Sequence, residues 1–224
     1  MRSARCWRLR RNSRNFWPCW KKRTPFGAAT APATIPLTAA TSSNLKIEEA
    51  VVVGHSFGGM VACELAAAYP RRVRRLTLID PIGFWRDADP IVNWVKLSPA
   101  ELPNYIFHNP AVEAAQRLLG PSEPPDAAIA ARVRLMWAMG ATSKFIWPIP
   151  DKGLKKRIHR VSAPTLVVWG ADDRLVPSVY ADEFSKRLAS VRVHIITGAG
   201  HAPHLEHPAA IAGLVRDFLT ATPH

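Results

Sequence analysis

The sequence predicts an α/β protein: a partial, doubly wound parallel sheet of four strands, with a helical insertion and a disordered basic N-terminal tail. Three observations support this. Four short β-branched runs alternate with helical patterns, as in a parallel sheet with right-handed crossovers. A long stretch rich in helical patterns separates the second run from the third. The chain carries no acidic residue before Glu48.

The four strands are expected at about residues 49–54, around 76–79, at 163–170 and at 191–198. The first run, AVVV, is so apolar that we predict a strand buried on both faces. Helices should follow the first, third and fourth strands, ending near Tyr69 before Pro70, spanning 178–190, and closing the chain from His207. Together the strands and these helices would form a core from 45–81 and 162–224.

Residues 82–161 are too long for a loop and too rich in helical patterns for disorder. We expect helices near 110–120 and 125–140, and shorter ones near 89–98 and 99–107. This segment is therefore predicted to be a helical insertion above the C-terminal ends of the strands.

Residues 1–44 are predicted to be a basic, low-complexity, disordered tail. Residues 1–26 mix arginine with tryptophan and show no sustained period, and 27–44 have the Ala, Thr, Pro and Ser content of a linker. The net charge is +13, but ten basic residues lie in 1–47, which leaves the other 177 residues at +3. Three interpretations of the tail remain open: nucleic-acid or anionic-surface binding, a targeting segment, or sequence from a wrong start or shifted frame. We favour the third.

Two further features of the sequence, its apolar runs and its cysteines, limit the possible functions. No apolar run approaches the roughly 20 residues of a membrane-spanning helix, so no membrane partner is predicted. The three cysteines form no CxxC pair, which indicates neither a disulfide framework nor a zinc site and favours a reducing, cytoplasmic location.

The chemistry centres on Gly54-His55-Ser56-Phe57-Gly58, between a strand and a helix. A serine hydroxyl is a poor nucleophile and needs a base, which in turn needs an acid to hold its tautomer. A Gly-x-Ser-x-Gly turn presents such a serine at a strand tip, with helix N–H groups behind it.

Candidate partners follow at the ends of later strands, where active sites of open α/β sheets lie. The third strand ends in GADDRLVP, which contains Asp172 and Asp173, and the fourth ends in GAGHAPHLEHP, which contains His201. The order serine, acid, histidine is the one expected after such a turn.

With these motifs, the chain from about 45 to 219 resembles the α/β-hydrolase superfamily, in particular its lid-bearing esterase-like and C–C-hydrolase-like enzymes. The resemblance rests on VVVGHSFGG, LIDP, LVVWGADDRLVP and GAGHAPHLEHP. It implies Ser56 as nucleophile, His201 as general base, Asp173 as the acid and Phe57 as an oxyanion N–H donor. The insertion would be the lid, with an aromatic lining of the substrate pocket drawn from Trp85, Trp94, Trp137, Phe145 and Trp147.

The implied function is a serine hydrolase acting on a small ester or a related acyl or C–C substrate, with no metal or other cofactor. The family's sheet has four strands before the serine turn, and a His-Gly loop that gives a second oxyanion donor. Residues 1–53 contain neither a strand pair nor an HG dipeptide. We therefore expect a half-built oxyanion hole and an exposed edge on the first strand, which invites self-association.

Alternatives stay open beside this interpretation. The protein could be a truncated, catalytically impaired homologue or pseudoenzyme, or, as a third hypothesis, could bind nucleic acid through its tail. At the level of residues, Ser56 could be a turn residue and Asp80 the acid. A fourth alternative is zinc bound by His201, His204 and His207, which are spaced three apart. His55 and Cys63 are expected to be packing residues.

Overall fold

A computed structural model of the chain describes residues 48–119 and 125–221. All of these residues belong to one compact unit, Pro32–His224. The predictions made for residues 1–44 lie outside the described residues. No helix in the described part of the chain combines the length and the apolar character needed to cross a bilayer.

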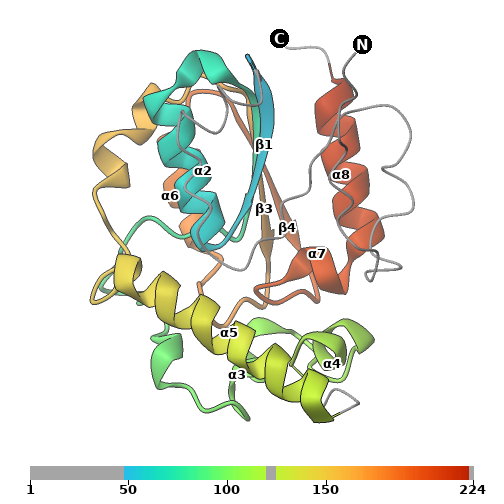
Figure 1. Cartoon of the computed structure of the whole chain (residues 1–224). Helices are drawn as coiled ribbons and strands as arrows, with labels where there is room; N and C mark the ends of the chain where they lie inside the picture. Colours follow the sequence, from blue (N-terminus) through green and yellow to red (C-terminus); the bar gives the residue numbers. More distant parts are fainter. Residues whose placement is uncertain (1–47, 120–124, 222–224) are drawn as a thin grey trace, which may run out of the picture. The chain divides into compact units, whose positions relative to one another are not determined.

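The predicted sheet is present (Figure 1): four parallel strands in the order β1-β2-β3-β4. Their bounds are β1 Ala50–His55, β2 Val73–Ile79, β3 Thr165–Gly170 and β4 Val191–Ile196. His55 lies beside Ile79, and Ile79 beside Val168, so the strands end along a common edge. Loops that follow these strands consequently meet at one place.

Helices cover both faces of the sheet, which confirms the doubly wound α/β class. Figure 1 shows α2 (Phe57–Ala68) and α6 (Tyr180–Ser185) on one face and α8 (Pro208–Thr220) on the other. The predicted helix at 178–190 is shortened to α6, but the N–H groups of Arg187 and Leu188 still donate to the carbonyl of Phe184, so a helical turn continues beyond it. The remaining short elements of the core are η1 (Pro70–Arg72) and α7 (Pro203–Glu206).

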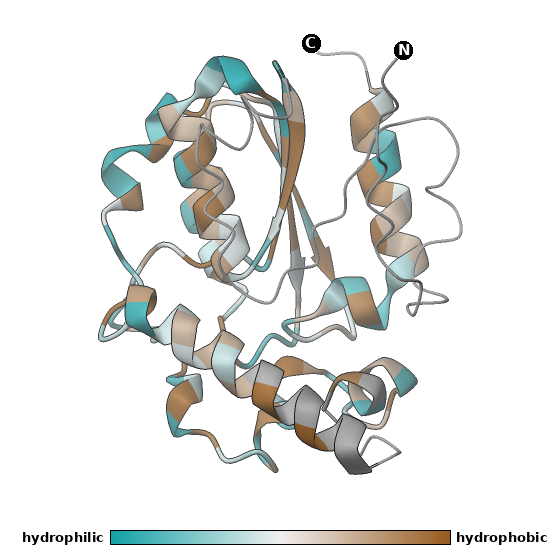
Figure 2. Ribbon diagram, viewed as in Figure 1, coloured by the Kyte–Doolittle hydropathy of each residue, from teal (hydrophilic) through white to brown (hydrophobic). Residues whose placement is uncertain are grey.

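The core is centred on the two inner strands. Every residue of β3 is buried, because β2 and β4 flank it and helices cover its faces. Trp169, Tyr180 and Phe184 are among the largest fully buried side chains. The indole N–H of Trp169 donates to the carbonyl of Val176 at 3.1 Å, so its polar atom is also satisfied. Figure 2 shows the same apolar lining where the helices meet the sheet.

The first strand differs from its prediction. We expected burial on both faces, yet Val51 and Val52 are half-buried and Val53 is 50% exposed. Within the described residues β1 pairs only with β2, which makes it an edge strand with its outer side open. This agrees with the exposed edge expected from the sequence; pairing of another chain with that edge stays a prediction.

The segment between β2 and β3 is helical and lies across the C-terminal ends of the strands (Figure 1). Its elements are η2 Trp94–Lys96, α3 Leu102–Ile106, α4 Glu113–Leu119, α5 Pro125–Ile146, η3 Leu154–Lys156 and η4 Ile158–Arg160. Trp94, Leu102 and Ile146 anchor it in the main hydrophobic core. The long helix α5 nevertheless leaves Met136 and Trp137 more than 70% exposed.

Candidate active site

The turn between β1 and α2 holds Ser56 in a strained conformation. The backbone of Ser56 has φ 53°, in the left-handed region that residues other than glycine rarely adopt. Its N–H donates to the carbonyl of Ile79 at 2.9 Å, and its carbonyl accepts from the N–H groups of Gly59 and Ile82 at 2.9 and 3.2 Å. These three backbone neighbours fix the serine at the strand tip. Strain held in this way is typical of functional turns.

Two glycines allow α2 to fold back over the strand. A Cβ on Gly54 would collide with the backbone of Gly58, and a Cβ on Gly59 would lie 2.7 Å from Cβ of Pro81. A Cβ on Gly58, in contrast, would meet nothing within 4 Å. The close approach therefore depends on Gly54 and Gly59, and only the first of these belongs to the Gly-x-Ser-x-Gly pattern.

The structure brings the three predicted polar side chains into one hydrogen-bonded chain. The His201 ring lies 2.8 Å from Oγ of Ser56 through Nε2 and 2.7 Å from Oδ2 of Asp173 through Nδ1. A carboxylate only accepts hydrogen bonds, so Nδ1 carries the proton and Nε2 is left to accept from the serine hydroxyl. The side chains of His201 and Asp173 are 4% and 0% exposed, so water competes little with either bond.

The two adjacent aspartates have different surroundings. Oδ1 of Asp173 accepts from the N–H groups of Leu175 and Val176, each at 2.9 Å, which fixes the carboxylate toward His201. Asp172 is 40% exposed; its Oδ2 accepts from the N–H of Gly198 and lies 3.1 Å from Nδ1 of His108. The geometry thus places Asp173, and not Asp172, against the histidine.

A second histidine from the serine turn supports the loop that carries His201. The Nε2–H of His55 donates to the carbonyl of His201 at 2.7 Å, and the His55 ring centroid lies 4.6 Å from that of His204. Burial, together with the neighbouring imidazoles, lowers the pKa of His55 well below its usual value. Burial and His201 likewise lower the pKa of His204 to about 4. Both rings are therefore neutral near pH 7.

Two of the three histidines of the zinc alternative, His201 and His207, already have hydrogen-bond partners. Both ring nitrogens of His201 are engaged, and the Nε2–H of His207 donates to the carbonyl of Gly198 at 2.9 Å. The group in the described residues whose donor atoms could surround a cation is Asp80, Asp173 and His201, with these atoms within 4.8 Å of one another. A metal there would have to replace the bond between Asp173 and His201.

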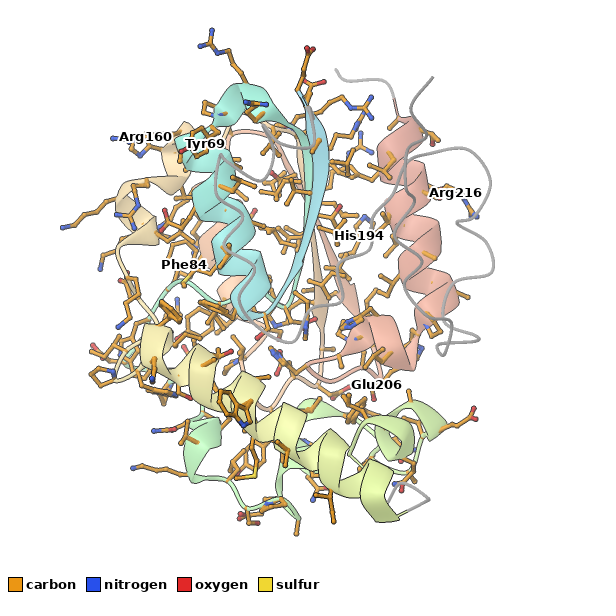
Figure 3. All side chains as sticks on the ribbon, viewed as in Figure 1. Tyr69, Phe84, Arg160, His194, Glu206 and Arg216 are labelled. Atoms are coloured by element: carbon orange, nitrogen blue, oxygen red, sulfur yellow. The ribbon has the colours of Figure 1, made fainter. Side chains whose placement is uncertain are left out.

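Glu206 was not singled out from the sequence, yet it joins the histidine loop to the insertion. Its Oε2 accepts from the N–H of Gly200 at 2.7 Å, and its Oε1 accepts from the N–H groups of His108 and Asn109 at 2.8 and 3.3 Å. Figure 3 shows Glu206 at the side of the core that faces the insertion. Gly200 also packs directly on this segment, since an added Cβ would lie 2.7 Å from the carbonyl oxygen of Ile106. The position of His201 is therefore coupled to that of the insertion.

The predicted oxyanion donor, Phe57, is the first residue of α2. Its N–H donates to no acceptor within the described residues and is thus available beside Ser56. The Phe57 ring stacks on Phe145 of α5, with centroids 6.2 Å apart, so α5 reaches the serine turn.

The five aromatic side chains proposed for the pocket occupy different environments. Phe145, on Phe57, is the one in contact with the serine turn. Trp94 is buried in the core and packs on the half-buried Trp147, with centroids 5.4 Å apart. Trp85 donates its indole N–H to Asp87, and Trp137 is 76% exposed.

The chain belongs to the α/β-hydrolase family. The model of that family matches residues 5–214, a range that begins well before the motifs on which the resemblance rested. The fold described above, with a strained serine at the tip of a parallel strand and an acid and a histidine at the ends of later strands, agrees with this membership.

Two curated relatives illustrate the range of activities in the family. A 2-hydroxy-6-oxononadienedioate/2-hydroxy-6-oxononatrienedioate hydrolase of Cupriavidus pinatubonensis is 29% identical over 191 residues, which cover 78% of this chain and 63% of the relative. A pimeloyl-[acyl-carrier protein] methyl ester esterase of Aromatoleum aromaticum is 30% identical over 219 residues, covering 88% of this chain and 86% of the esterase. The chain thus spans 63% of the length of the first relative and most of the second.

Solved structures show the same fold. A hydrolase from Pseudomonas aeruginosa superimposes with a TM-score of 0.59 at 25% identity, covering 81% of this chain and 69% of that one. A bacterial membrane phospholipase A gives a TM-score of 0.63 at 24% identity over 80% of this chain and 59% of the other.

Proposed function

We propose that the chain is a serine hydrolase that cleaves a small ester or a related acyl or C–C substrate. The observation that carries this proposal is the buried chain of hydrogen bonds from Ser56 through His201 to Asp173. The family model supports the proposal by placing the chain in the α/β-hydrolase family; the hydrolase activity, the triad and the substrate class are the proposal.

In the proposed reaction Ser56 attacks the substrate carbonyl while its hydroxyl proton passes to Nε2 of His201. Asp173 holds Nδ1–H and stabilises the imidazolium. The negative charge that develops on the carbonyl oxygen is stabilised by the free N–H of Phe57 at the start of α2. His201 then gives its proton to the leaving group. A water molecule, activated by the same histidine, releases the acyl group from the serine.

Ester and C–C substrates are both retained in the proposal because the two curated relatives described above carry the names of different hydrolases. One relative is named as an esterase, and another as a hydrolase of a 2-hydroxy-6-oxo dienoic diacid. Both reactions require a carbonyl carbon to be held over the same nucleophile. The contact between Phe57 and Phe145 supports an apolar boundary beside that carbon.

A p-nitrophenyl ester assay on the purified chain and on Ser56→Ala tests the proposal. Loss of the serine should reduce kcat/KM by about 10⁴-fold or more, to the rate of background hydrolysis. Ser190→Ala is the matched control, because Ser190 is exposed on the turn before β4. Equal rates for wild type and Ser56→Ala would contradict the proposal and favour the hypothesis of an impaired homologue.

A second assay distinguishes the two substrate classes. The same three proteins are supplied with a 2-hydroxy-6-oxo dienoate, whose absorbance is lost on C–C cleavage. Turnover that depends on Ser56 with this substrate, but not with the ester, assigns the C–C class; the reverse assigns the ester class.

A further inference from the structure

A third acidic side chain, that of Asp80, lies close to Asp173 and His201 and takes no part in the reaction proposed above. It follows β2 directly and is fully buried. Its backbone has φ 42°, in the left-handed region, which aspartate tolerates better than most residues but still at a cost. A buried acid in an unfavourable backbone conformation indicates a specific requirement for its side chain.

One oxygen of Asp80 has a partner and the other does not. Oδ1 accepts from the N–H of Gly170 at 2.9 Å, which ties it to the end of β3, three residues before Asp173. Oδ2 makes no hydrogen bond within the described residues. Donor atoms of Asp80, Asp173 and His201 all lie within 4.8 Å of one another, so a carboxylate oxygen of Asp80 is close to a second buried carboxyl group.

Two carboxylates at this distance in a dry site cannot both carry a charge unless a cation compensates them. No Lys or Arg forms an ion pair with Asp80 in the part of the chain that the structure describes. The ionisable groups around it are Asp173, Glu206 and His201. Burial above all, and then the charge of Asp173, raise the pKa of Asp80 well above its usual value. Asp173, by contrast, is held as a carboxylate by two backbone N–H donors and by His201.

We propose that Asp80 is a neutral carboxylic acid whose O–H donates to the carboxylate of Asp173, which makes it a positioning residue for the histidine. The inference rests on the proposed function, because it assigns Asp80 a part in tuning that same site. A neutral donor withdraws charge from the carboxylate, so Asp173 stabilises protonated His201 less strongly. Asp80 therefore keeps the base weak enough to release its proton to the leaving group.

The pKa of His201, followed by NMR of its ring in the full chain, tests this inference without any need for turnover. Asp80→Asn keeps an N–H donor toward Asp173 and should leave the pKa of His201 nearly unchanged. Asp80→Leu removes the donor and should raise it by about 1 unit. If Asp80 were ionised, Asp80→Asn would remove a negative charge and lower the pKa of His201. That result would overturn the proposal, as would an Asp80→Leu variant that folds and titrates like wild type.

Infrared difference spectra locate the proton independently, and remain decisive if Asp80→Leu fails to fold. At neutral pH the carbonyl band of a protonated carboxylic acid should be present in wild type and absent in Asp80→Asn. It should persist in Asp173→Asn and in the inactive Ser56→Ala. Loss of the band in Asp173→Asn, with retention in Asp80→Asn, would place the proton on Asp173 and contradict the proposal. Because Ser56→Ala is measured in the same series, a chain without hydrolase activity can still confirm or overturn the role of Asp80.

Discussion

The loops at the strand ends and the helices of the insertion differ in what their side chains contact. At the strand ends, polar groups such as Asp173 and His201 are buried and bound from several sides. On α5 the reverse holds, since apolar side chains such as Met136 and Trp137 are largely exposed. The strand ends thus hold the side chains of Asp173 and His201 in one geometry. The insertion, by contrast, presents apolar side chains on α5 that the core does not cover.

The two regions are nevertheless joined at one place. Glu206 binds backbone N–H groups on both sides, from Gly200 next to His201 and from His108 at the insertion. The exposed bond between Asp172 and His108 lies at the same junction. The insertion and the histidine loop are therefore connected through backbone groups that Glu206 binds.

The largest predicted effect contrasts the two neighbouring aspartates at that junction. Asp173→Asn should lower kcat by about 10⁴-fold, because an amide no longer holds the histidine tautomer that accepts the serine proton. Asp172→Asn, at a 40% exposed side chain that contacts the insertion, should change kcat by less than about tenfold. Steady-state kinetics on an activated ester measure both. A comparable loss in the two variants would mean that the buried and exposed sides of the junction are not functionally distinct.

The next largest effect is expected from a comparison of two tryptophans, Trp169 in strand β3 and Trp137 in α5 of the insertion. Trp169→Ala removes a fully buried ring and leaves the carbonyl of Val176 without its donor, so the free energy of unfolding should fall by about 3–5 kcal/mol. Trp137→Ala removes a ring that is 76% exposed and should cost less than about 0.5 kcal/mol. Urea unfolding followed by circular dichroism gives both values. A large loss in Trp137→Ala would show that α5 is packed more firmly than its exposure indicates.

The four parallel strands were predicted correctly, because they depend on short local patterns. The catalytic roles of Ser56, Asp173 and His201 stay predictions, and the patterns on which they rest are equally local. Strand runs, a glycine-flanked serine and acidic and histidine loops are each contained within about ten residues. The burial of β1 was predicted wrongly, since an apolar run reports the composition of a strand and not whether both its edges are paired. The contacts that Glu206 and Asp80 make in the fold could not be predicted either. Their partners lie about 90–100 residues away along the chain, at Gly170 and His108, and only folding brings them together.

A smaller effect should appear in the pH dependence of stability. The pKa of His204 is lowered to about 4 by burial, whereas an unfolded histidine titrates near 6.5. The unfolded chain therefore binds the proton first as the pH falls. The contribution of neutral His204 to the free energy of unfolding is therefore fully present above about pH 6.5. It decreases toward pH 4, by up to about 3 kcal/mol.

His204→Phe, which keeps an aromatic ring beside His55, should flatten the stability profile between pH 6.5 and 4. His194→Gln is the control, since His194 is exposed on β4 (Figure 3) and its replacement should leave the profile as in wild type. Urea unfolding at half-unit pH intervals gives the slope of the free energy of unfolding against pH for the wild type and the two variants. An unchanged slope in His204→Phe would show that His204 can be protonated in the folded chain, in contradiction to its lowered pKa.

The last contrast lies within the serine turn itself. Gly59→Ala puts a Cβ against Pro81, at 2.7 Å from its Cβ and 3.1 Å from its Cα, where part of the contact is backbone that cannot rotate away. The turn must then open, and we expect a loss of about 1–3 kcal/mol in the free energy of unfolding. Gly58→Ala adds the same methyl group to the same helix where nothing lies within 4 Å. It should be neutral or stabilising by up to about 1 kcal/mol, because alanine favours the helix. If both variants lose stability equally, the approach of α2 to Pro81 is not what sets the requirement for glycine beside the serine. If they differ as expected, the buried side of the turn is fixed by packing while its open side remains free to meet a substrate.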